Sequence, residues 1–346
     1  MKVFSASEAI SPAIERTKRY LFEPFDWGMY LKLSAVACIT EGFSANLNLS
    51  SHHPSPPPSG GSPILHLPAE IVAAIVAVVL LGLVIGIIVF YLVTRLRFAF
   101  FHCLAHKTKL IRPGWTLYKA QAMRLFTASL VIWFCFLAIL ALLLLPFFFT
   151  FFELIRNADA GGHFDVGKFL LTLLPLIAIV FVLSLLAYVI DVVMRDFMLP
   201  HMALENASFG QAWAAVRPRI GAEKGAFFFY LFLRAVLPFV AMIGVFIVAA
   251  LPLLIVFGAL GLAGMGFHAV LAHGTGVIAF IRVAIEIMFG VTGAGLGLLV
   301  AFSLGGPVAT WIRNYALLFY GGRYAALGQI LYPNPPPPTF VGQPGW

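Results

Sequence analysis

Uncharged apolar stretches of more than 20 residues restrict what this chain can fold into more than any other feature. Ile71 to Thr94 contains 24 residues without a charge, and Leu125 to Phe152 contains 28. A helix needs about 20 apolar residues to cross the hydrocarbon core of a bilayer. Because 61% of the chain is hydrophobic and only 10% is charged, a water-soluble fold has too few polar residues to cover this surface. The sequence therefore predicts an all-α, polytopic transmembrane helix bundle.

Hydropathy divides this bundle into about six spans, of which the first is the least regular. Its apolar run is short because only eight residues separate Lys32 from Glu41. Hydropathy alone makes this segment interfacial or re-entrant. The predicted spans lie near residues 27–46, 70–94, 125–152, 169–194, 230–258 and 280–304.

The distribution of Lys and Arg decides how the first segment is interpreted. If it spans, eighteen Lys and Arg residues lie on one side of the membrane, and Arg156 and Lys168 lie on the other. Loops rich in Lys and Arg stay in the cytoplasm. We therefore predict six spans with both termini cytoplasmic.

The amino-terminal segment, residues 1–26, is predicted to be a cytoplasmic amphipathic helix. Ser5 and Glu8 have the spacing of a capping box. Two interpretations of its apolar stripe stay open: it lies among anionic lipid headgroups, or it packs against the protein's own cytoplasmic loops. The stripe consists of Ile10, Ile14, Thr17 and Leu21.

The membrane domain, residues 27–320, is interrupted and followed by segments of biased composition. Residues 47–68 form an external Pro/Ser-rich linker, and residues 321–346 form a proline-rich cytoplasmic tail. The tail is either a plain extension or a ligand for an aromatic groove on a partner protein.

Charged residues near hydrocarbon are candidates for function. Asp191 and Arg195 are four residues apart and share a helix face, as do Arg282 and Glu286. Each pair is a structural ion pair at the membrane boundary or part of a translocation path. The candidate intramembrane or boundary charges are Asp191, Arg195, Asp196, Arg234, Arg282 and Glu286.

Arg234 requires a partner if its helix starts near Gly225, because it then lies about 15 Å along the axis. We predict that it pairs with Asp191 on the preceding span. If Arg234 instead lies at the water boundary, the span begins later.

Glycines are expected to let the sixth span approach a neighbour closely. Gly293 and Gly297 have the small-xxx-small spacing of such contacts.

Motifs for chemistry are weak in this sequence. His102 and His106 lie on one helix face, the minimum for a metal site, but no third ligand is evident and Cys103 stands where a zinc protease has its glutamate. No Ser or Cys stands in a nucleophile motif. We therefore predict no catalytic residue, no metal and no cofactor. The linker histidines, which could hold a metal only loosely, are His52, His53 and His66.

Three short motifs resemble a bacterial membrane family. Leu21 to Trp27 precedes the first span, Pro113 to Trp115 lies in the first cytoplasmic loop, and Asp196 to Met202 follows the fourth span. They are similar to uncharacterised six-helix inner-membrane proteins related to the membrane domain of glycerophosphodiester phosphodiesterases. The resemblance implies a bacterial inner-membrane helical domain without the phosphodiesterase barrel.

Three functions remain open at this point. The leading hypothesis is a non-enzymatic integral membrane protein that is a scaffold or a subunit of a membrane assembly. The alternatives are a transporter or channel for a small solute or lipid, and an interfacial lipid-modifying enzyme in which His102, His106 or His201 meets a carboxylate such as Asp196. The expected partners are the lipid bilayer, anionic headgroups at the cytoplasmic face, and a protein partner or a second copy of the chain, with no nucleic acid.

Overall fold

The computed structural model describes residues 3–42, 69–159, 166–271 and 276–332. These residues are 91% helical and contain no strand, which confirms the all-α class. The predicted linker at 47–68 lies outside the described residues, as does the chain from residue 333 onward. The helices in chain order are α1 (Ile10–Phe22), α2 (Trp27–Gly42), α3 (Ala69–Ala105), α4 (Ile111–Leu117), α5 (Lys119–Asp159), α6 (Val166–Val192), the π-helix η1 (Val193–Met198), α7 (Leu199–Leu204), α8 (Phe209–Ala222), α9 (Lys224–Leu271), α10 (Val277–Gly321) and α11 (Ala325–Leu331).

Five helical segments are long and apolar enough to cross a membrane. The longest, α9, has 48 residues and extends about 72 Å at 1.5 Å per residue, more than twice the roughly 30 Å of hydrocarbon. Helix α2 has 16 residues and is not among the five. The five segments are Glu70–Ala105, Lys119–Arg156, Phe169–Leu204, Lys224–Leu271 and Val277–Gly321.

Burial changes abruptly along these helices. No residue from 277 to 305 of α10 is buried, whereas most of residues 306–321 are. In α9 the buried residues end at Arg234. Since exposed apolar surface in water costs about 25 cal/mol per Å², the exposed stretches have the composition expected for contact with lipid, and the buried stretches form the packed core.

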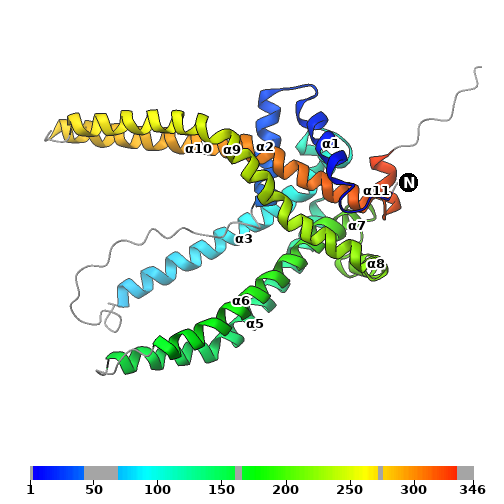
Figure 1. Ribbon diagram of the computed structural model, residues 1–346, viewed down its shortest axis with the longest axis horizontal. Coiled ribbons are helices and arrows are strands. Elements are labelled where there is room, and N and C mark those ends of the chain that lie inside the picture. Colours follow the sequence, from blue (N-terminus) through cyan, green and yellow to red (C-terminus); the bar gives the residue numbers. More distant parts are fainter. Residues whose placement is uncertain (1–2, 43–68, 160–165, 272–275, 333–346) are drawn as a thin grey trace, which may run out of the picture. The chain divides into compact units, whose positions relative to one another are not determined.

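The chain divides into two compact units. The first contains Met1–Asn48, His102–Ile111 and Glu223–Trp346, and the second contains Leu49–Phe101 and Arg112–Ala222. Within the first unit α9 and α10 lie side by side, and within the second α5 and α6 do (Figure 1).

The chain ahead of α1 forms the predicted capping box. The amide of Ser5 donates to Oε2 of Glu8 at 2.9 Å, and the amide of Glu8 donates to Oγ of Ser5 at 3.3 Å. The two reciprocal bonds satisfy donors that the start of a helix otherwise leaves unpaired. The turn they stabilise, residues 5–9, leads directly into α1.

Helix α1 packs against the carboxyl-terminal half of α10. Nδ2 of Asn314 donates to Oγ1 of Thr17 at 2.9 Å, and Nε1 of Trp311 donates to the carbonyl of Ile10 at 3.4 Å. Ile14, which the sequence placed in the apolar stripe, is exposed, and the buried residues of α1 are Ala13, Thr17, Tyr20 and Leu21. The interpretation that α1 packs on the protein itself is therefore the one that the structure supports.

A second set of contacts holds α1 to the last turn of α3 and to the segment that follows it. Nη2 of Arg16 donates to the carbonyl of Leu104 at 2.7 Å, and the Tyr20 hydroxyl donates to the carbonyl of Thr108 at 2.9 Å. Burial raises the pKa of the Tyr20 phenol, so the hydroxyl remains a neutral donor. Two side chains of α1 thus satisfy carbonyls at a helix end.

Helices α2 and α10 approach each other most closely at two glycines. A Cβ on Gly306 would lie 2.2 Å from Cβ and 2.5 Å from Cα of Ser34, and a Cβ on Gly305 would lie 3.0 Å from Sγ of Cys38. Only glycine fits at position 306 with this backbone spacing. Of the two glycines predicted to allow a close approach, Gly293 would have Cδ2 of Leu260 3.5 Å from its Cβ, which is an ordinary contact, whereas nothing lies within 4 Å of a Cβ built at Gly297.

A hydrogen bond joins the two helices next to this crossing, where a proline interrupts the backbone bonds of α10. Pro307 has no amide hydrogen, so the carbonyl of Ser303, four residues earlier, loses its donor within α10. The Tyr30 hydroxyl donates to that carbonyl at 2.6 Å. A side chain of α2 thereby replaces a missing backbone bond of α10.

We expect Tyr30→Phe to lower the free energy of unfolding by about 1–3 kcal/mol, because it leaves the Ser303 carbonyl without its donor. The cost should nearly vanish in a Pro307→Ala background, where the new amide at position 307 can donate to Ser303. Denaturant unfolding of the four proteins in detergent micelles measures this coupling. Equal costs of Tyr30→Phe in both backgrounds would refute the compensation.

Candidate functional site

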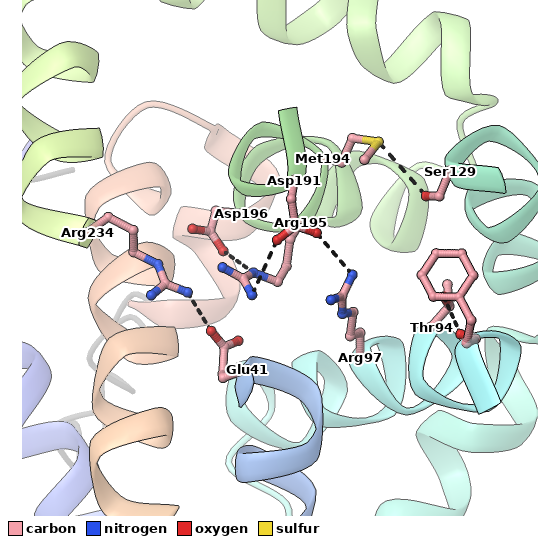
Figure 2. A network of polar contacts seen from close by, with 10 residues as sticks. Glu41, Thr94, Arg97, Ser129, Asp191, Met194, Arg195, Asp196 and Arg234 are labelled. Atoms are coloured by element: carbon pink, nitrogen blue, oxygen red, sulfur yellow. Dashed lines mark hydrogen bonds and ion pairs between the residues drawn. The ribbon is translucent and has the colours of Figure 1, made fainter. Parts of the chain in front are cut away.

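Two arginines and two aspartates form a network in the second unit (Figure 2). Nη1 of Arg97, from α3, lies 3.4 Å from Oδ1 of Asp191. Arg195 connects two carboxylates, with Nη1 3.6 Å from Oδ2 of Asp191 and Nε 3.5 Å from Oδ1 of Asp196. The structure therefore brings together three of the residues selected from the sequence and adds Arg97 to them.

The local sequence explains why this network lies at η1. Pro200 cannot donate to the carbonyl of Asp196, so the regular ladder of helical bonds is interrupted where η1 gives way to α7. Short π-helical turns of this kind often occur at functional sites. Here η1 carries Arg195 and Asp196, and both side chains are buried.

The charges of this network balance. The side chain of Asp196 is fully buried and that of Arg195 is 5% exposed, so each needs an opposite charge nearby. Two guanidinium groups and two carboxylates give no net charge. This balance suits a structural network that fixes α3 and η1 better than it suits a binding site for a charged substrate.

A separate buried ion pair lies in the first unit, between Glu41 and Arg234. Oε2 of Glu41, in the last turn of α2, accepts from Nη2 of Arg234 in α9, and the two side chains are 9% and 6% exposed (Figure 2). Sequence reasoning missed Glu41 as the partner. One signal for it was available: Glu41 is the single acidic residue of α2, and Arg234 is the single charged residue of α9 after Lys224.

The predicted pair of Arg234 with Asp191 would join residues of different units, and it stays a prediction. The carboxylate that the structure places against Arg234 comes from its own unit. Arg234 is the last buried residue of α9.

The pair of Arg282 and Glu286, selected in the sixth span, has a histidine next to it. Nε of Arg282 lies 3.6 Å from Oε1 of Glu286, and Nδ1 of His268, from α9, lies 2.7 Å from the same oxygen. Glu286 also lines an open cleft of about 340 Å³ between α9 and α10. Its other lining residues are Phe257, Leu260, Gly261, Gly264, Met265, Ile285 and Phe289. The cleft is apolar apart from this carboxylate.

The two histidines proposed as a weak metal site lie close together. The ring centroids of His102 and His106 are 4.6 Å apart. Among the described residues, no group of three or more His, Cys, Asp or Glu side chains is arranged to hold a metal ion. Cys103 lies between the two histidines near the end of α3. Its thiol donates to the carbonyl of Leu110 at 3.3 Å, in the segment that follows the helix.

His201 has a carboxylate partner other than the one considered from the sequence. Its Nδ1 lies 3.2 Å from Oε2 of Glu205, and its Nε2 lies 3.5 Å from Nη1 of Arg219. A guanidinium only donates, so Nε2 acts as the acceptor and Nδ1 carries the hydrogen that Glu205 accepts. The imidazole is 1% exposed, which gives it a positioning role between α7 and α8 rather than contact with a substrate.

Comparison with protein families identifies one that covers residues 4–330 of the chain. The chain belongs to DUF7544, a family of unknown function. Neither the curated proteins nor the solved structures gave a match. The matched residues include most of both units and every candidate residue above. The buried charge networks therefore lie within the domain that defines the family.

Proposed function

We propose that this chain is a non-enzymatic integral membrane protein that acts as a scaffold or subunit of a membrane assembly. The proposal rests on the exposure of the five long apolar segments. In each of them, the most apolar stretch is 0% buried within the chain. Such surfaces need lipid or other helices around them. The buried charges of Arg195, Asp196 and Arg234, by contrast, pair with charged side chains of the chain's own helices.

The contacts of α1 support six membrane crossings with both termini on one side. Helix α1 bonds to α10 through Asn314 and Trp311, near the end of the last span. Termini on the same side require an even number of crossings, whereas five helical segments are long enough. Helix α2, which precedes α3, supplies the sixth crossing in this proposal. The side is the cytoplasm, because Lys and Arg are concentrated there.

The membrane in this proposal is the bacterial inner membrane, as the resemblance to the membrane domain of glycerophosphodiester phosphodiesterases implies. The transporter alternative has one observation in its favour, the apolar cleft that contains Glu286. The lipid-enzyme alternative has less support, because His201 is buried and its contacts are with Glu205 and Arg219. A protein partner and a second copy of the chain both remain candidate neighbours for the exposed helices.

Purification in a mild detergent after chemical crosslinking in intact membranes tests this function. We expect the full chain to carry either a stoichiometric protein partner or a second copy of itself, with crosslinks in the exposed stretch of α5 or α9. A monomeric chain that carries an enriched small solute would contradict the scaffold proposal and favour transport.

The same membranes test the topology. Single cysteines placed at position 55 and position 107, in a chain whose native cysteines are replaced by serine, should react with an impermeant maleimide from opposite sides. Labelling of both from one side would contradict the six-crossing arrangement. Extraction of the chain by alkaline carbonate would contradict membrane integration altogether.

A further inference from the structure

Four aromatic rings, three of them exposed, form a cluster where α1 passes into α2. The ring centroids of Phe22 and Phe25 are 6.1 Å apart, those of Phe25 and Trp27 are 5.8 Å apart, and those of Trp27 and Tyr30 are 5.7 Å apart. Phe22, Phe25 and Trp27 are 41%, 52% and 54% exposed, although apolar rings are normally buried when they pack together. We call these four residues the aromatic cluster.

The cluster is held firmly by the first unit. Tyr30 is buried and bonds to the carbonyl of Ser303, and Tyr20, one turn before the end of α1, bonds to Thr108. Exposure of the other three rings is therefore a property of the packed structure and not of a loose terminus. An exposed, fixed group of aromatic side chains marks an interaction surface.

A lysine borders the aromatic cluster, and a second lysine lies two residues before it in the chain. Nζ of Lys109 donates to the carbonyl of Pro24 at 2.7 Å, which places its charge at the centre of the segment between Phe22 and Phe25. Lys107, two residues earlier, is exposed and has a φ of 54°, so the loop turns sharply at this point. Leu110, which follows Lys109 in the chain, has an exposed apolar side chain.

Two carboxylates belong to this segment, and Glu23, which directly follows Phe22, is exposed. Oδ1 of Asp26 accepts from the amides of Gly28 at 2.9 Å and Met29 at 3.2 Å. Its charge is therefore engaged by the amino-terminal end of α2, where the helix dipole is positive. The surface presents aromatic rings together with ammonium groups and the carboxylate of Glu23.

Rings of this kind prefer the headgroup level of a bilayer, and lysines beside them are attracted to anionic lipids. We propose that the aromatic cluster, together with Lys107 and Lys109, binds the headgroups of anionic phospholipids. This inference rests on the proposed membrane integration of the chain. The site lies where α2 begins, at the Lys- and Arg-rich end of the predicted first crossing.

Native mass spectrometry of the delipidated full chain in detergent tests the lipid preference. Phosphatidylglycerol is the anionic probe and phosphatidylcholine is the neutral one. A lysine near the surface contributes about five-fold in affinity, so Lys107→Gln combined with Lys109→Gln should weaken retention of phosphatidylglycerol by roughly 25-fold. The matched control, Arg112→Gln with Lys119→Gln, removes two exposed charges just beyond the loop and should change it little.

Fluorescence provides a second measurement that does not depend on the lysines. Brominated phosphatidylglycerol in mixed micelles should quench the emission of Trp27, so the quenched fraction should fall in Trp27→Phe. Trp213→Phe, which removes another exposed tryptophan, is the control and should leave the quenched fraction nearly unchanged.

Three outcomes would overturn the proposal: equal retention of the two lipids by the wild-type chain, equal loss in the lysine and control variants, or a quenched fraction that does not fall in Trp27→Phe. Crosslinking of position 27 to a protein in place of lipid would overturn it as well. Each of these leaves membrane integration intact, whereas extraction by carbonate contradicts the proposed function itself. The two failures are therefore distinguishable.

Discussion

Glu41→Gln is expected to lower the free energy of unfolding by about 3–5 kcal/mol, because it leaves the guanidinium of Arg234 buried without a negative charge. Arg234→Gln should cost a similar amount, since it leaves the carboxylate of Glu41 equally isolated. Both side chains are less than a tenth exposed, so water cannot replace the missing partner. Denaturant unfolding in mixed micelles, followed by circular dichroism, measures the loss.

The double variant Glu41→Leu with Arg234→Met should recover most of this stability, because two apolar side chains remove both charges from the core. Glu15→Gln provides the matched control within the same chain. Its partner is Arg19, and the two side chains are 62% and 69% exposed, so breaking this pair should cost only about 0.3–0.5 kcal/mol. Equal costs at Glu15 and Glu41 would show that burial does not determine the strength of these pairs.

Gly306→Ala is expected to destabilise the protein by about 3 kcal/mol, the upper end of what overpacking costs. The added Cβ would lie 2.5 Å from Cα of Ser34, and a backbone atom cannot move aside as the end of a long side chain can. Helix α2 would therefore have to shift away from α10. Faster maleimide labelling of Cys38 in a Cys135→Ser background would report that shift, since Cys38 lies against the same turn of α10.

Gly297→Ala is the control for this substitution. It lies two to three turns earlier in α10 and has open space where its Cβ would be. Alanine is favoured over glycine within a helix by up to about 1 kcal/mol, so this variant should be neutral or slightly stabilising. Unfolding midpoints that fall equally in both alanine variants would contradict the close approach at Gly306.

The sequence by itself was sufficient for features that depend on neighbouring residues. Long uncharged apolar stretches predicted the long helices, because in lipid a helix satisfies its backbone bonds internally. The capping box of Ser5 and Glu8 and the facing positions of Asp191 and Arg195 follow from helical spacing, which fixes which side chains meet within one or two turns. The all-α class and these local contacts were predictable for that reason.

Contacts between distant segments depend on where helices cross. The periodic pattern of apolar residues in the sequence does not show where these crossings are. Gly297 and Gly306 look alike in sequence, but only Gly306 faces the backbone of Ser34. Pro307 leaves the Ser303 carbonyl unpaired wherever it occurs, yet only tertiary packing brings Tyr30 to it.

The partner of Arg234 shows the same limit at the candidate site. Its charge and depth in α9 made a buried partner necessary, and this requirement is a property of the sequence. Which carboxylate meets that requirement was decided by the path of α2, which places Glu41 there from 193 residues away. Local chemistry thus determined that the buried charges need partners, and the tertiary structure determined which residues provide them, because only folding sets the distance between segments so far apart in the chain.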